Sequence, residues 1–265
     1  MFDAVVILGA RKGDSEQANA KKALLELFES ERERVFYSRQ LEIMFEDKWF
    51  HWITNRALRQ LVNEGEVISE AYQLSNGVPL FIVRHKGYRY PRRKAARVFA
   101  LVDEYSHHEV SADLGFQGEA LVLDGFARNQ FVLLERDSRV YGDKEWTDTD
   151  HDLDFIFKRD GIGYGVEVKN MLGYMDHDEL VQKTEICLAL GIRPLFAARM
   201  LPKVWINEVI QVGGFALIMK YQMYPKGRRD LVARMRDELG LPVDTPSALL
   251  DGTMKRFVDW HKKKL

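Results

Sequence analysis

Apolar residues recur at helical spacing through the first part of the chain. The spacing predicts an amphipathic helix over residues 19–32, a second helix that begins after an N-cap at Ser38, and a third over residues 50–63. Two stretches rich in β-branched and aromatic residues, 66–74 and 78–83, flank Asn76-Gly77, a pair favoured in tight turns. The pattern therefore predicts three helices followed by a β-hairpin.

The solvent face of the third predicted helix carries side chains suited to nucleic acid. Its apolar stripe leaves Asn55, Arg56, Arg59 and Gln60 toward solvent. Arginine can bind guanine or phosphate through two parallel hydrogen bonds, and Asn or Gln can do the same with adenine. We therefore expect these four residues to contact DNA.

A basic stretch follows the predicted hairpin. Residues 85–97 contain six Lys or Arg and no acid, with tyrosines between the cations. Such a composition suits a phosphate backbone and exposed bases. Four of these cations are candidate DNA contacts: Lys86, Arg89, Arg92 and Arg93.

Three helices and a hairpin in this order resemble a winged helix-turn-helix module over about residues 19–90. The resemblance lies in the pattern of elements and implies DNA binding. Winged helices also serve as protein–protein modules, so that alternative stays open.

The second half of the chain alternates between helix and strand patterns. Helices are predicted over residues 92–105, 115–126 and 178–190, and strands over 152–157, 164–169 and 195–198. The helix at 178–190 is expected to bury Leu180, Val181, Thr184, Cys187 and Leu188. His107 and His108 end the helix that starts at residue 92, and adjacent side chains diverge, so this pair is a poor shared metal site.

Asp160-Gly161 predicts a two-residue hairpin turn between the strands at 152–157 and 164–169. With these two residues at its centre, Asp154 lies opposite Glu167 and Asp152 lies opposite Lys169. Because side chains alternate along a strand, all four project from one face of the sheet. Facing carboxylates repel each other, and a divalent cation would reverse the sign of that interaction.

Two carboxylates with a nearby lysine match the needs of phosphodiester hydrolysis. A bound cation would polarise the phosphate and activate water, and the ammonium would stabilise the water or the developing charge. Oxygen ligands without cysteine favour Mg²⁺ or Mn²⁺ over zinc. The alternative is a surface salt-bridge cluster with little energetic value.

At Asp154 and the Glu167-Val168-Lys169 triplet the chain resembles the PD-(D/E)XK nuclease superfamily, which has the restriction-endonuclease-like fold. The resemblance covers about residues 110–222 and includes the order helix, three strands, helix, strand. It implies that Asp154 and Glu167 bind metal and that Lys169 supports the nucleophile, and Glu119 resembles an additional helix acid of some branches. Leu153 stands where the motif has proline, and Asp152 is a competing candidate for the metal role. Gln182 and Lys183, on the following helix, are secondary candidates.

Composition limits the class of protein. The chain has 265 residues, of which 46% are hydrophobic and 30% charged, and its 39 Lys and Arg balance 40 Asp and Glu. This composition indicates a globular protein and excludes a uniformly basic surface. The single cysteine excludes an internal disulfide and favours a cytoplasmic protein. The apolar run at residues 4–8 is too short to span a membrane and predicts a strand.

The combined prediction is a two-domain α/β protein. A winged-helix domain over residues 1–92 precedes a restriction-endonuclease-like mixed sheet flanked by helices over residues 93–265. The predicted function is Mg²⁺- or Mn²⁺-dependent cleavage of DNA, with a homodimer left open. The alternatives are a non-catalytic DNA-binding regulator with a degenerate nuclease-like dimerisation domain, and an RNA-directed nuclease.

Overall fold

The computed structural model describes residues 3–265, with side chains from Ser15 onward. The chain divides into two compact units. The first unit contains the chain up to Val110 together with Ala233–Leu241, and the second contains Ser111–Val232 together with Pro242–Leu265. Residues 92 and 93, the predicted domain boundary, are the first two residues of a helix of the first unit.

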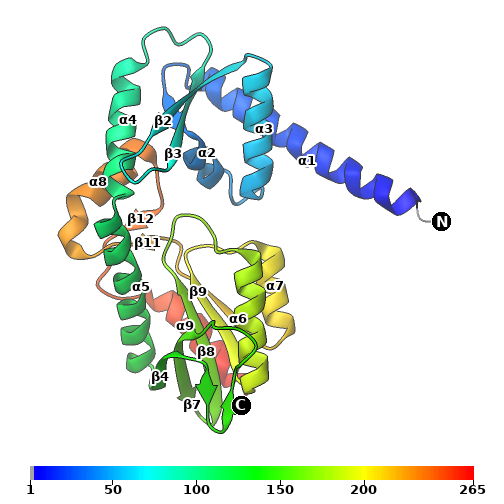
Figure 1. Cartoon of the computed structure of the whole chain (residues 1–265), viewed down its shortest axis with the longest axis vertical. Helices are drawn as coiled ribbons and strands as arrows, with labels where there is room; N and C mark the ends of the chain where they lie inside the picture. The colour runs from blue at the N-terminus through cyan, green and yellow to red at the C-terminus, as the bar shows by residue number, and fades with distance from the viewer. Residues whose placement is uncertain (1–2) are drawn as a thin grey trace. The chain divides into compact units, whose positions relative to one another are not determined.

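The first unit combines helices with a small antiparallel sheet (Figure 1). Its sheet has the order β1-β3-β2, and the core lies between this sheet and the first three helices. Gly77 has a φ of 84° in the β2–β3 turn, as the Asn76-Gly77 pattern predicts. Its elements are α1 (Asp3–Ser30), β1 (Val35–Tyr37), α2 (Ser38–Met44), α3 (His51–Asn63), β2 (Val67–Gln73), β3 (Pro79–His85) and α4 (Arg92–Tyr105).

The strand predicted for residues 4–8 is wrong, because this segment belongs to the helix α1. A short apolar run does not by itself distinguish a strand from a helix. Here it continues without a proline into the amphipathic stretch that packs Leu24 and Phe28 in the core. The longer helical pattern therefore determines the conformation of the whole segment.

The segment Ala233–Leu241 joins the first unit through contacts distant in sequence. It includes most of α8 (Arg229–Leu239). Arg97 Nε lies 2.7 Å from Glu238 Oε2, and Arg234 Nη2 lies 2.5 Å from Glu104 Oε1. The buried Gln40 amide also donates to the carbonyl of Leu239 at 2.7 Å. No local pattern in the sequence indicates this return of the chain.

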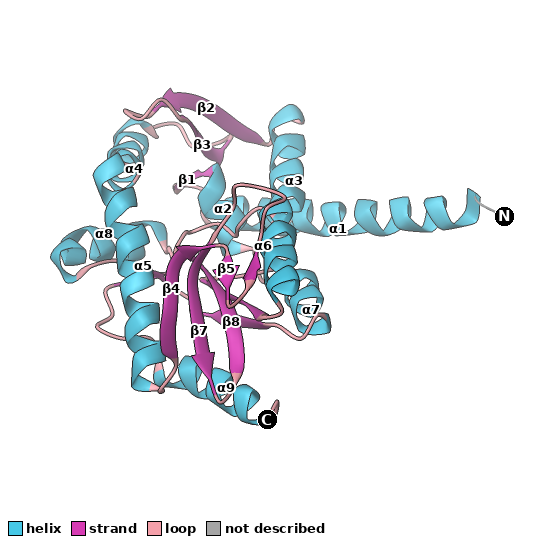
Figure 2. Cartoon of the chain, turned by 60° about the horizontal axis from the view of Figure 1, so that its bottom comes forward, coloured by secondary structure: helices cyan, strands magenta, loops and turns pink. Residues whose placement is uncertain are grey.

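The second unit is built on a five-stranded mixed sheet of order β10-β9-β8-β7-β4 (Figure 2). The strands β4, β7 and β8 are antiparallel, and β8, β9 and β10 are parallel. Its elements are α5 (His108–Arg128), β4 (Val132–Ser138), β5 (Val140–Tyr141), β6 (Lys144–Glu145), β7 (Leu153–Arg159), β8 (Ile162–Lys169), α6 (His177–Leu190), β9 (Arg193–Ala198), α7 (Lys203–Gln211), β10 (Phe215–Ile218), β11 (Gln222–Met223), β12 (Val243–Asp244) and α9 (Asp251–Lys262).

Helices cover both faces of this sheet. Phe126 of α5 and Phe257 of α9 pack with Phe155, Phe157 and other residues of one face. On the other face, residues of α6 pack against Leu153, Ile156 and Phe196, and Val209 of α7 joins them over β9. The prediction of a mixed sheet flanked by helices is confirmed. Among residues 3–265 no helix has the length and apolar character needed to cross a membrane.

Candidate active site

The hairpin of β7 and β8 has the predicted turn and register. Asp160 and Gly161 have φ values of 50° and 80°, the left-handed conformation that a two-residue hairpin turn requires. The ladder runs from Arg159↔Ile162 to Phe155↔Val166. The positions that follow in this register are Asp154 and Glu167, on the sheet face covered by α6.

Glu167 is the centre of a charged cluster on this face. Its side chain is 2% exposed, and both of its oxygens have ammonium partners. Lys169 Nζ lies 2.9 Å from Oε1, and Lys183 Nζ lies 2.8 Å from Oε2. Asp154 Oδ2 accepts a hydrogen bond from the backbone N–H of Val168 at 2.6 Å. The structure thus gathers four of the predicted site residues.

Lys169 has a second carboxylate partner, which was not among the predicted site residues. Its Nζ lies 2.7 Å from Oε1 of Glu179, in the first turn of α6. Burial opposes the charge on Lys169, but Glu167 and Glu179 outweigh burial and raise its pKa above the ordinary value. The ammonium is therefore held in place and charged. The signal in the sequence is the i, i+4 spacing of Glu179 and Lys183, which places both over the cluster.

The predicted buried stripe of α6 is partly wrong. The buried residues of this helix are Leu180, Lys183, Ile186, Cys187 and Leu190, whereas Val181 and Leu188 are exposed. The reason is Lys183, which is 5% exposed and reaches inward to Glu167 and to the backbone carbonyl of Asp152. The buried side of α6 therefore includes Lys183 and differs from the side that its apolar residues alone predict.

The carboxylates of Asp154 and Glu167 are held together at an energetic cost. Burial and then the charge of Glu167 raise the pKa of Asp154 to about 7. Oε2 of Glu167 is buried and accepts no hydrogen bond from the described part of the chain, although Lys183 lies beside it as an ion-pair partner. Two adjacent carboxylates, one with this unfilled hydrogen-bonding capacity, fit a hard divalent cation such as Mg²⁺ or Mn²⁺.

The other predicted site residues lie around this cluster or apart from it. Asp152 Oδ1 is 3.8 Å from Lys183 Nζ, at the margin of the cluster. Gln182 is partly exposed on α6. Glu119 of α5 pairs instead with Arg136 of β4 at 3.2 Å, and its helix packs on the opposite face of the sheet. The structure does not bring Glu119 to the two carboxylates.

Asp154→Asn is expected to stabilise the metal-free protein by ~1–3 kcal/mol at pH 8. The amide removes the repulsion with Glu167, and its oxygen can still accept the hydrogen bond from Val168. Between about pH 4 and pH 7 the native state of the wild type keeps a proton on Asp154, whereas the unfolded state has released it. The stability that the native state gains by keeping this proton is therefore present at low pH and lost as the pH rises through about 7.

Urea unfolding of both proteins at pH 5 and pH 8, in the presence of a chelator, measures this effect. The stability difference between wild type and variant is expected to shift in favour of the variant at the higher pH. An equal difference at both pH values would contradict the prediction.

His107, His108 and Glu109 form a second group of metal-ligand side chains. Their ligand atoms lie within 4.8 Å of one another, and the two imidazole rings are 4.3 Å apart. The expectation that the histidines diverge is wrong, because His107 lies between α4 and α5 and His108 is the first residue of α5. The chain bends between them, so the angular rule for a continuous helix does not apply.

In the first unit, α3 presents a polar stripe to solvent. Trp52, Arg56, Arg59 and Asn63 are exposed at helical spacing, and the Arg56 guanidinium lies 4.5 Å above the ring centre of Trp52. Trp52 is not among the residues predicted from the sequence. Of the four predicted contact residues, Arg56 and Arg59 belong to the stripe. The other two have partners within the unit: Asn55 donates to Glu42 and Gln60 donates to Glu64.

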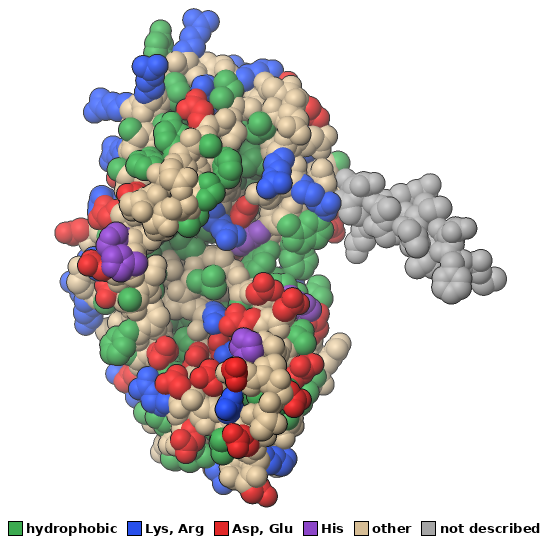
Figure 3. All heavy atoms as spheres, viewed as in Figure 1, with side chains coloured by type: hydrophobic (Ala, Val, Ile, Leu, Met, Phe, Trp, Pro, Cys, Tyr) green, Lys and Arg blue, Asp and Glu red, His purple; other side chains and the backbone are tan. Residues whose placement is uncertain are grey.

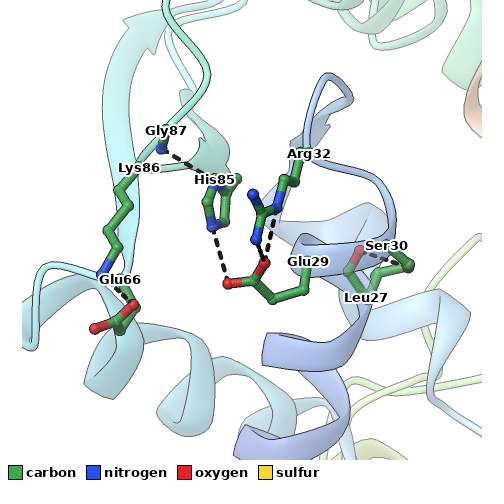
Figure 4. Close-up of polar contacts among 8 residues, drawn as sticks. All are labelled: Leu27, Glu29, Ser30, Arg32, Glu66, His85, Lys86 and Gly87. Atoms are coloured by element: carbon green, nitrogen blue, oxygen red, sulfur yellow. Dashed lines mark hydrogen bonds and ion pairs between the residues drawn. The ribbon is translucent and has the colours of Figure 1, made fainter.

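The basic stretch after the hairpin contains paired and unpaired cations. Lys86 Nζ lies 2.5 Å from Glu66 Oε2 (Figure 4). Arg89, Arg92 and Arg93 are exposed and have no ion-pair partner among the described residues. Lys and Arg side chains project around the start of α4, whereas Asp and Glu gather over the second unit (Figure 3). Three of the four predicted cations are therefore available to a polyanion.

The comparisons with known proteins found no relative of this chain. No family model matches it, and neither a curated protein nor a solved structure matches it. The chemistry of the two carboxylates and their lysines is therefore the basis for inferring a function.

Proposed function

We propose that the chain is a metal-dependent DNA endonuclease of the restriction-endonuclease-like kind. The observation that supports this most directly is the cluster of Asp154, Glu167 and Lys169 on one face of β7 and β8. The buried carboxylate of Glu167 and the partly buried one of Asp154 repel each other, and Asp154 holds its proton up to about pH 7 in the absence of a cation. A site with this property gains stability from a divalent cation and suits chemistry at a phosphate.

Asp154 and Glu167 would hold the cation, which when bound polarises the phosphate and lowers the pKa of an attacking water. Lys169, fixed between Glu167 and Glu179, would orient that water or stabilise the negative charge that develops on the phosphate. Lys183 would keep the Glu167 carboxylate in position from the other side. These roles use groups that the fold already holds in place.

The order of elements supports this assignment for the second unit. A helix (α5), three strands of the main sheet (β4, β7 and β8), a helix (α6) and a further strand (β9) follow one another. The two carboxylates and Lys169 lie on the central hairpin of this arrangement. The same order underlies the resemblance to the PD-(D/E)XK nucleases.

A winged-helix role is part of the same proposal for the first unit. The elements α1, β1, α2, α3, β2 and β3, with the sheet order β1-β3-β2, give three helices packed on a hairpin. The stripe of Trp52, Arg56, Arg59 and Asn63 on α3 offers groups that bind phosphates and base edges. This unit would hold the DNA, and the proposed location is the cytoplasm.

A cleavage assay tests the proposal. The wild-type chain is incubated with plasmid, linear, branched and single-stranded DNA in Mg²⁺ and in Mn²⁺, beside Glu167→Ala and the control Glu145→Gln, an exposed acid on β6. We expect cleavage by the wild type and the control, and none by Glu167→Ala. A wild type that cuts no DNA in either metal would favour a non-catalytic DNA-binding role. Cutting that survives Glu167→Ala would exclude Glu167 from the site of cleavage.

A further inference from the structure

The loop between β3 and α4, residues Lys86–Pro91, is anchored by hydrogen bonds between its backbone and residues 84 and 85 at the end of β3. The N–H of Gly87 donates to His85 Nδ1 at 3.0 Å, and the N–H of Tyr88 donates to the carbonyl of His85 at 3.1 Å. His85 is buried, and its Nε2 lies 3.3 Å from Glu29 Oε1 of α1 (Figure 4). Arg84 Nη1 donates to the carbonyl of Tyr88 at 3.0 Å.

This anchored loop displays an aromatic ring to solvent. Tyr90 is 82% exposed, although the residue after it, Pro91, is buried. A large aromatic side chain gains free energy when it leaves water, so an exposed ring beside exposed arginines suits a partner that combines flat apolar faces with negative charge. The bases of nucleic acid provide such a surface.

Three arginines flank the ring, none of them with an ion-pair partner within 4 Å among the described residues. Arg89 precedes Tyr90, and Arg92 and Arg93 stand in the first turn of α4. The helix dipole disfavours cations at this end of a helix, and α4 has no acid in its first turn. A polyanion would remove this unfavourable interaction. The ring and the arginines together fit a base with phosphates on either side of it.

The loop adjoins the end of α3. Lys86 Nζ lies 2.5 Å from Oε2 of Glu66, and the N–H of Lys86 donates to the Glu66 carbonyl at 3.2 Å. Glu66 follows the C-cap of α3, Glu64, by two residues. The exposed stripe of α3 therefore ends beside the loop that carries Tyr90.

We propose that Tyr90 stacks on an unpaired base at a junction between double- and single-stranded DNA. This inference rests on the proposed DNA-binding function of the first unit. The faces of bases within a duplex are covered by their neighbours, and removing one from the stack costs a few kcal/mol. An unpaired base offers its face without that cost. The stripe of α3 holds the duplex, and Arg89, Arg92 and Arg93 hold the phosphates of the emerging strand.

Equilibrium binding in the presence of a chelator tests the proposal without cleavage. The two probes are a blunt duplex and the same duplex with a single-stranded tail, in which 2-aminopurine replaces one unpaired base at a time. We expect the wild type to bind the tailed duplex roughly tenfold more tightly than the blunt one. Stacking on Tyr90 is expected to quench 2-aminopurine at the position next to the junction.

Variants assign the effect to the ring. Tyr90→Ala is expected to lose the preference and the quenching while binding the blunt duplex as before, and Tyr90→Phe is expected to keep both. The control Phe116→Ala removes another highly exposed ring, 74% exposed on α5, and is expected to change neither. Equal affinity of the wild type for the two probes, or a preference that survives Tyr90→Ala, overturns this proposal alone. No binding to either probe overturns the proposed DNA-binding function as well.

Discussion

Lys183→Met is expected to lower the free energy of unfolding by roughly 2–4 kcal/mol. The Lys183 ammonium is buried and lies 2.8 Å from Oε2 of Glu167, which is itself buried. Methionine keeps most of the side-chain volume but leaves that carboxylate with Lys169 as its remaining ion-pair partner. Oε2 of Glu167 would then be buried without a cation beside it, and removing one partner of a buried ion pair is strongly destabilising.

Chemical denaturation of the wild type and three variants measures this effect. The variant Lys158→Met, at an exposed lysine of β7, is the control and is expected to change stability by less than about 0.5 kcal/mol. The double variant Glu167→Gln, Lys183→Met is expected to recover a large part of the loss, because the buried carboxylate that lost one of its two cations is replaced by a neutral amide. A Lys183→Met protein as stable as the control would show that the ion pair contributes nothing to folding.

Lys169→Ala is expected to lower the rate of DNA cleavage by roughly 10²–10⁴-fold while the protein stays folded. Lys169 contacts Glu167 and Glu179, so its ammonium is oriented by two carboxylates beside the proposed cation ligands. Its side chain is partly exposed, in contrast to that of Lys183, which allows it to reach substrate. Loss of this group removes charge stabilisation without removing a cation ligand.

Single-turnover cleavage at saturating DNA separates this chemical effect from binding. Glu179→Gln serves as the comparison, because it keeps the lysine and removes one of the two charges that orient it. A smaller loss of rate, roughly tenfold, is expected for Glu179→Gln. Full activity of Lys169→Ala in both Mg²⁺ and Mn²⁺ would exclude the catalytic role of Lys169 and leave a structural ion-pair cluster.

Local chemistry was enough to predict the hairpin that carries the site. Asp160-Gly161 adopts the left-handed turn, and the period of two along β7 and β8 then aligns Phe155 with Val166, as predicted. The positions of α3, α4, α6 and β9 were also predictable, since the helices show a helical spacing of apolar residues and β9 is a short apolar run. These features depend on neighbours in the chain.

Other features depended on the elements that adjoin them in the chain. Residues 4–8, predicted as a strand, belong to α1, because a short apolar run is compatible with either element and a long helical pattern follows it directly. The bend between α4 and α5 brought His107 and His108 together, which an isolated helix would not do. In both places the conformation of a few residues follows that of the elements around them.

The sequence by itself determined which residues share a face of β7 and β8, because turn chemistry and side-chain alternation act between near neighbours. Only the tertiary structure decided which side chains complete the cluster. Lys183 turns inward because a buried carboxylate on another element needs a counter-charge, and Glu119 turns to Arg136 because α5 packs on the other face. These ion pairs depend on burial and on charges that come together only in the folded chain.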